Sequence, residues 1–66
     1  MYYRLTVPRN DNEPVVYIWN DFGLAMDLFH FFDKETRKED NVLGTGHPVL
    51  ETVEEDGRIV STIKYN

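Results

Sequence analysis

The sequence predicts an α+β domain with the element order ββαββ: a four-stranded, largely antiparallel sheet with one helix packed on one face. Three observations predict this fold. Two β-rich segments precede residue 20, a segment of helical periodicity follows, and two further apolar segments flank an Asp-Gly pair near the C-terminus. A chain of 66 residues is long enough for one domain, so we expect a single unit over residues 1–66, with a β-grasp-like strand order as one option.

Two strands are predicted at residues 2–7 and 15–19. The first alternates between two faces, which is the period of a half-buried strand. Its apolar face holds Tyr3, Leu5 and Val7, and its other face holds Tyr2, Arg4 and Thr6. The second, "VVYIW", places Val16 and Ile18 on one face and Val15, Tyr17 and Trp19 on the other. Pro8 and the polar stretch "RNDNE" between the two strands predict a hairpin turn.

A helix is predicted from residue 22, with Asn20 or Asp21 as its N-cap. At about 100° per residue, the apolar side chains fall in one arc of roughly 180°. This arc holds Phe22, Leu24, Ala25, Leu28, Phe29, Phe31 and Phe32. The opposite side holds Met26, Asp27, His30, Lys34 and Arg37. Beyond Phe32 the arc becomes polar, so we expect packing to stop there and the end of the helix to be solvated.

The segment "NVLGTGHP" is predicted to be a connecting loop. Gly44 and Gly46 are free to adopt positive φ angles, and Val42 and Leu43 are the expected apolar anchors of the loop.

The last two strands form a predicted hairpin whose register depends on the turn. A two-residue turn would mix charged and apolar side chains on both faces. A three-residue loop at 55–57, with Gly57 left-handed, places Val53 opposite Ile59 and Val49 opposite Ile63, and we expect this register. Ser61 then points inward. The outward side chains are Leu50, Thr52, Glu54, Val60, Thr62 and Lys64.

Composition excludes several classes of protein. The chain has no cysteine for disulfides or thiolate sites, and its N-terminus lacks a signal-peptide pattern. No apolar run is long enough to cross a membrane, so we expect a cytoplasmic protein without a membrane partner. The net charge is −5 and the basic residues are scattered, which argues against direct binding of nucleic acid.

Few residues offer catalytic or metal-binding chemistry. Asp27 and His30 could supply two metal ligands, but a site needs three or four, and a solvated helix face explains them better. Thr45 and His47 form a conceivable pair without an orienting third group, in what reads as a flexible connection. We therefore expect no enzyme activity, no metal and no cofactor.

Acidic residues crowd the second hairpin: Glu51, Glu54, Glu55 and Asp56. Alternate residues of a strand lie roughly 6.6 Å apart, comparable to neighbouring phosphates of a nucleic acid. A carboxylate rim of this kind could imitate DNA toward a basic protein surface. The simpler interpretation is that these acids only solvate the turns of an acidic domain.

Aromatic residues exceed what the core of a small domain requires. One helix covers only one face of the sheet, and Tyr17 and Trp19 are expected on the uncovered face, with Phe31 at the edge of the helical arc. Such side chains commonly anchor protein interfaces. They would bind a partner protein or cover the sheet of a second copy in a homodimer.

The segments "YYRLTV", "VVYIWN" and "DFGLAMDLFHFF" give the chain a hairpin followed by an aromatic helix and more strand. In this topology and in its acidity it resembles small phage-encoded inhibitors and DNA mimics, such as the uracil-DNA glycosylase inhibitors. It lacks a Glu-x-x-Tyr on the helix and has a longer terminal hairpin. The resemblance implies a non-catalytic inhibitor that blocks a host or defence protein with a basic or nucleic-acid-binding surface. The alternative is a homo-oligomeric accessory protein without an external target.

Overall fold

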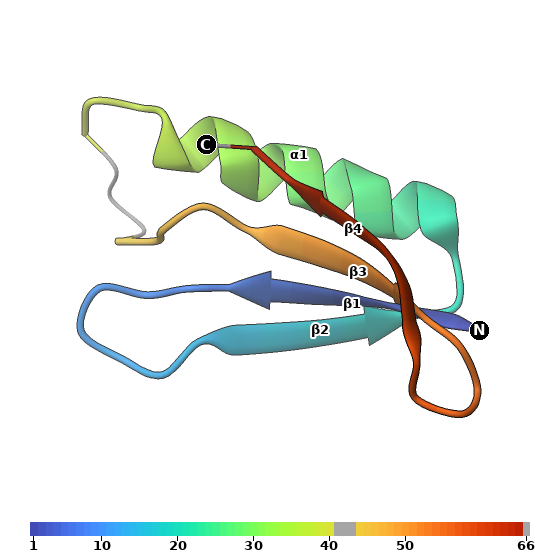
Figure 1. Cartoon of the computed structure of the whole chain (residues 1–66). Helices are drawn as coiled ribbons and strands as arrows, with labels where there is room; N and C mark the ends of the chain where they lie inside the picture. The colour runs from blue at the N-terminus through green and yellow to red at the C-terminus, as the bar shows by residue number, and fades with distance from the viewer. Residues whose placement is uncertain (41–43, 66) are drawn as a thin grey trace.

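The computed structural model describes residues 1–40 and 44–65 and confirms the predicted α+β fold (Figure 1). The elements are β1 (Tyr2–Val7), β2 (Val15–Trp19), α1 (Phe22–Thr36), β3 (Val49–Val53) and β4 (Ile59–Lys64). The strand order is β2-β1-β3-β4 with every neighbouring pair antiparallel, so the β-grasp-like order is not adopted. Helix α1 packs on β1, β2 and β3.

The main core lies between α1 and the two central strands. Its fully buried members are Leu5, Val7, Ala25, Phe29 and Leu50. Tyr3, Tyr17, Trp19, Met26, Leu28, Phe32 and Ile63 pack around them. The alternation predicted for the first strand is confirmed, since the side chains of Leu5 and Val7 are buried and that of Tyr3 packs beside them.

The faces of β2 are reversed relative to the prediction. Tyr17 pairs with Leu5, and residues paired across neighbouring strands share a face of the sheet, so Tyr17 lies on the helix-covered side. Trp19 follows it there. The expectation that Tyr17 and Trp19 occupy the uncovered face is therefore wrong. Val16 and Ile18 point to that face instead and are 52% and 61% exposed.

Of the two expected cap residues, Asn20 and Asp21, the N-cap of α1 is Asp21. Its Oδ1 accepts a hydrogen bond from the backbone N–H of Leu24 at 3.1 Å, which satisfies one of the unpaired amides of the first turn.

Helix α1 is rotated about its axis relative to the predicted arc. Ala25 and Phe29 face the core, and Met26, expected on the solvent side, packs against it. Leu24 and Phe31, expected in the packed arc, are 56% and 49% exposed. The buried direction is displaced by roughly 50°, half of one residue step. Which side of the helix is buried depends on the side chains of the sheet beneath it. The helical pattern alone does not contain this information.

The β3–β4 hairpin follows the predicted turn but not the predicted register. Gly57 has a φ of 89° and Val53 pairs with Ile59, as expected. A β-bulge then leaves Val60 without a partner, so Ile63 pairs with Leu50 and not with Val49. The expected outward position of Leu50 is wrong because Leu50 pairs with the buried Leu5 of β1, which places its side chain on the helix-covered face. Ser61, expected inward, is exposed.

Val53 is buried outside the main core. It lies three residues from Leu50 on one strand, so its side chain points to the opposite face of the sheet. It is nevertheless only 1% exposed and belongs to no part of the main cluster. Its register partners are Tyr2 on β1 and Ile59 on β4.

The connecting loop is only partly described. Gly44 has a φ of 62°, as predicted, whereas Gly46 does not have a positive φ. The expected anchors Val42 and Leu43 lie outside the described residues.

Candidate partner-binding surface

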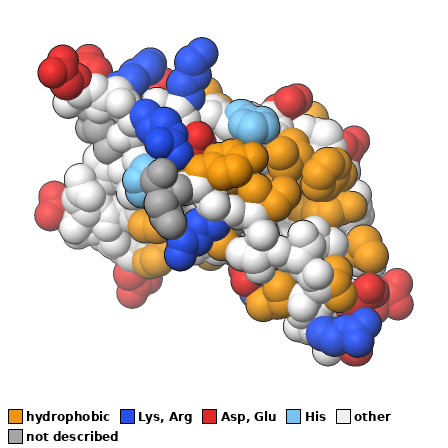
Figure 2. Space-filling model, turned by 45° about the horizontal axis from the view of Figure 1, so that its top comes forward, with side chains coloured by type: hydrophobic (Ala, Val, Ile, Leu, Met, Phe, Trp, Pro, Cys, Tyr) orange, Lys and Arg blue, Asp and Glu red, His pale blue; other side chains and the backbone are white. Residues whose placement is uncertain are grey.

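Large apolar side chains remain exposed around the molecule. Among the described residues nine are between 43% and 61% exposed: Met1, Val16, Ile18, Phe22, Leu24, Phe31, Ile59, Val60 and Tyr65. Figure 2, turned so that its top comes forward, shows hydrophobic side chains gathered over a broad area with both acidic and basic side chains around its margin. Contiguous exposed apolar area on a small domain commonly marks an interaction site.

The side of α1 that adjoins β2 can be identified from ring contacts. Phe32 stacks on Tyr17 of β2, whereas His30 faces Tyr65, just after β4. At 100° per residue, Leu24, Leu28 and Phe31 continue around the helix from Phe32, away from the β4 side. We refer to the apolar side chains on this side of the molecule as the β2–α1 surface. Its members are Tyr17, Trp19, Leu24, Leu28, Phe31 and Phe32.

Four rings form a continuous row across this surface. Trp19 stacks on Tyr17 with centroids 5.5 Å apart and planes at 14°. Tyr17 stacks on Phe32 at 5.9 Å, and Phe32 meets the edge of Phe31 at 5.3 Å. The structure therefore brings together the three aromatic residues predicted as partner contacts, Tyr17, Trp19 and Phe31. They meet beside the helix and not on the open face of the sheet.

A hollow of about 130 Å³ adjoins the two middle rings of this row, Tyr17 and Phe32. Its lining residues are Val7, Arg9, Val15, Tyr17, Phe32 and Thr45. Most of the lining is apolar, and Arg9 supplies a guanidinium for which no ion pair occurs within residues 1–40 and 44–65.

The predicted acidic rim divides into two parts. Glu51 accepts a hydrogen bond from Arg4 Nε at 3.0 Å on the open face, and its side chain is only 18% exposed. This hydrogen bond and the charge of Glu51 raise the pKa of Arg4. Glu51 is therefore not a free carboxylate.

The other three acids lie on the β3–β4 turn. Glu55 is 94% exposed at its side chain and lies 3.9 Å from the N-terminal amine. Asp56 Oδ1 accepts a hydrogen bond from the backbone N–H of Arg58 at 3.0 Å, and Glu54 closes the turn through its backbone. Only these three remain as a candidate charged rim.

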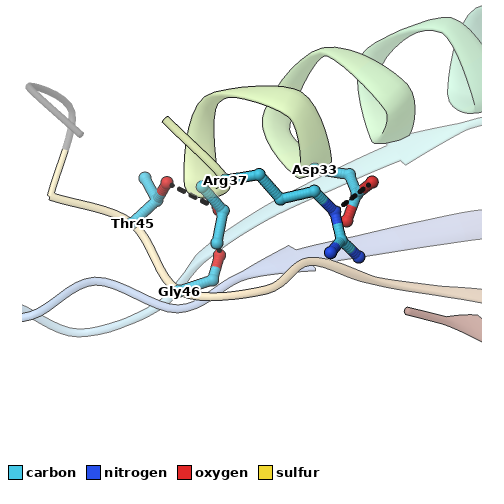
Figure 3. A network of polar contacts seen from close by, with 5 residues as sticks. Asp33, Arg37, Thr45 and Gly46 are labelled. Carbon is cyan, nitrogen blue, oxygen red and sulfur yellow. Dashed lines mark hydrogen bonds and ion pairs between the residues drawn. The ribbon is translucent and has the colours of Figure 1, made fainter. Parts of the chain in front are cut away.

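Polar contacts fasten the loop to the end of α1 (Figure 3). Thr36 donates a hydrogen bond to the Gly46 carbonyl at 2.9 Å and lies 3.3 Å from the Thr45 hydroxyl. Arg37 pairs with Asp33 at 3.1 Å. The expected solvated end is confirmed for residues 37–40, which are exposed, but not for Thr36, which is partly covered because the loop folds back over it. Thr45 is only 6% exposed, which makes its hydroxyl a structural contact.

Asp27 and His30 are both exposed on the helix. In the described part of the chain, no three His, Asp or Glu side chains lie close enough to hold a metal ion. No helix there is long and apolar enough to cross a membrane.

Three residues of this surface were assigned to the core from sequence alone: Leu24, Leu28 and Phe32. Leu28 and Phe32 do pack against the core, whereas Leu24 is 56% exposed. The missing signal was the pairing of Leu5 with Tyr17, which fixes the face of β2 and hence the side on which the helix leaves apolar residues exposed.

No protein-family model, no curated protein and no solved structure matches this chain. Function is therefore argued from the surface described above.

Proposed function

We propose that this protein is a non-catalytic protein-binding inhibitor whose β2–α1 surface contacts its target. One observation carries the proposal: Leu24 and Phe31 are about half exposed on a helix that buries only Ala25 and Phe29 fully. Full burial of a side chain of this size contributes about 1.5–3 kcal/mol. Because Leu24 and Phe31 are half exposed, a partner that covers them can recover about half of that for each.

The aromatic row suits an interface. Trp, Tyr and Phe side chains dominate the energetics of binding sites because each buries a large area. Tyr17, Trp19 and Phe32 are already held by mutual stacking and by contact with the core. Little side-chain freedom remains to be lost on association, which lowers the entropic cost of binding.

The acidic turn is proposed to steer the target. Trp19 pairs with Tyr3, and the neighbouring Tyr2 pairs with Val53 at the end of β3, so Trp19 and the 54–56 turn lie at one end of the sheet (Figure 1). Complementary charge raises association rates. The target is then a protein with a basic surface, and a nucleic-acid-binding host or defence protein blocked by a phage-type inhibitor fits this chemistry.

The test compares capture of partners from a bacterial lysate by tagged variants. We expect the double variant Leu24→Ser with Phe31→Ser to lose the partner recovered by the wild type. The matched control, Ile59→Thr with Val60→Thr, removes apolar side chains of similar exposure from β4 and should retain it. Recovery should fall at high salt. Equal recovery by the wild type and the Leu24/Phe31 variant would contradict the proposal.

The second candidate is a homo-oligomeric accessory protein. It is favoured by Val16 and Ile18, which leave the open face of the sheet apolar near β2. Light scattering after size-exclusion chromatography distinguishes the two. A monomer at high protein concentration counts against self-assembly, and a stable dimer counts in its favour.

A further inference from the structure

β2 is an unprotected edge strand. It pairs with β1 alone in the described sheet, through five regular residue pairs without a bulge. Its sequence, "VVYIW", contains no charge and no proline. Proteins usually block such edges with charged side chains, prolines or bulges, because the outer backbone groups accept another strand. The opposite edge, β4, has such features: a bulge at Val60 and a charged Lys64.

Both faces of β2 present apolar side chains next to this edge. Val16 and Ile18 are exposed on the open face. On the other face Tyr17 and Trp19 adjoin the flank of α1, where Phe31 stands out. Side chains of a strand alternate between faces. A strand added at β2 would therefore contact both apolar sets at once.

We infer that the β2 edge binds an extended segment of the target protein as a fifth strand of the sheet. The segment has apolar residues at its centre and Lys or Arg at its ends. This inference rests on the proposed function and names the way in which the target is held. Backbone hydrogen bonds supply affinity in such strand addition, and pockets beside the strand supply specificity.

The charges around β2 favour this occupant. Glu13 precedes the strand and Asp21 follows it, so a carboxylate stands near each end, with Asp11 farther along the turn. Of the two basic residues on this hairpin, Arg4 is paired with Glu51 and Arg9 lies at the rim of the hollow. Basic residues at the ends of the incoming segment complement the two carboxylates.

The same charges oppose a second copy of this chain. An antiparallel pairing of two β2 strands centred on Tyr17 matches Val15 with Trp19 of the other copy. It also places Glu13 opposite Asp21 at both ends. Like charges facing each other across strands are destabilising, and each copy already carries a net charge of −5.

The hollow offers a position for one side chain of the segment. It lies between Val15 and Tyr17 of β2 and Phe32 of α1. Its volume of about 130 Å³ is close to the roughly 150 Å³ of an apolar cavity that accommodates benzene. A branched aliphatic side chain therefore fits there, and this adds a preference for sequence to the pairing of backbones.

The experiment selects binders from a displayed library of random peptides of about twelve residues, long enough to cover β2 and both flanks. We expect selected peptides to alternate apolar residues and to carry Lys or Arg at their ends. Their Kd should rise at least about tenfold in Ile18→Lys, because a charge on the edge blocks strand addition. Val60→Lys is the matched control on β4 and should leave Kd unchanged. Bound peptide should slow hydrogen exchange of the 15–19 amides.

The outcomes distinguish strand addition at β2 from partner binding by the β2–α1 surface as a whole. An absence of selected binders, or peptides indifferent to Ile18→Lys, overturns strand addition. If the lysate partner is lost in the Leu24/Phe31 variant but retained by Ile18→Lys, the proposed function stands without it. Glu13→Lys should weaken basic-ended peptides by roughly threefold to tenfold at low salt and less at high salt. A dimer abolished by Ile18→Lys would identify a second copy as the occupant and overturn the inference.

Discussion

The ring of Tyr17 on β2 stacks on the ring of Phe32 on α1, with centroids 5.9 Å apart and planes inclined by 27°. This contact joins the edge strand to the helix and marks the rotation of the helix over the sheet. With Phe32 on the β2 side, Phe29 reaches the centre of the core and Phe31 is left at the outer flank. One stacking pair thus relates the core to the proposed binding surface.

Truncation of Phe29 should destabilise the protein far more than truncation of Phe31. Phe29 is fully buried, so Phe29→Ala should cost about 3–5 kcal/mol, comparable to the whole stability of a domain this small. Phe31→Ala should change the free energy of unfolding by about 0.5 kcal/mol. Urea denaturation followed by circular dichroism measures both. Equal losses would contradict the rotation of α1 described here.

Asp21→Ala should destabilise the protein by about 1 kcal/mol, because the first turn of α1 loses the carboxylate that accepts the Leu24 amide. Asn20→Ala is the control, since Asn20 lies one residue outside the cap and should have little effect. The urea midpoint of each variant checks the prediction. A larger loss of stability in the Asn20 variant would identify Asn20, and not Asp21, as the N-cap.

Gly57→Ala should cost about 1–2 kcal/mol through backbone strain alone, since its φ is 89° and a Cβ would meet no atom within 4 Å. Asn tolerates left-handed conformations better, so Gly57→Asn should lose less stability than Gly57→Ala. Thermal denaturation of the two variants measures the difference. An unchanged melting temperature in Gly57→Ala would contradict the three-residue turn.

The Arg4–Glu51 ion pair should couple by about 0.2–1 kcal/mol, since it lies on the open face with both side chains partly exposed. A double-mutant cycle with Arg4→Met and Glu51→Gln measures this energy. The double variant of this cycle removes a neutral pair, so it should leave the salt dependence of partner capture unchanged. Loss of the salt dependence in the double variant would show that Glu51 contributes to the electrostatic steering of the target.

Local pattern was sufficient for the order of elements, for a helix cap at Asn20 or Asp21 and for the turn at Gly57. Each of these depends on a few adjacent residues: an acceptor before a helix, a residue free to adopt positive φ, or an alternation of period two. Such features are contained in short stretches of sequence.

The candidate site was harder to predict because it depends on contacts between elements. The faces of β2 were divided correctly, but only its pairing with β1 shows which face meets the helix. The position of Leu50 follows from its pairing with Leu5 on β1, and the bulge at Val60 moves Ile63 from Val49 to Leu50; no residue type in β4 indicates this bulge. Tyr17, Trp19 and Phe31 were selected as partner contacts for their chemistry, and the structure adds the neighbours that make them one surface.

Hydrogen–deuterium exchange on the complex with the captured partner tests whether the partner binds at β2 and the adjoining flank of α1. Our account predicts slower exchange in β2 and along the outer flank of α1 around Leu24 and Phe31, with β4 unchanged. Protection concentrated on β4 and the β3–β4 turn, with β2 exchanging as in the free protein, would contradict it.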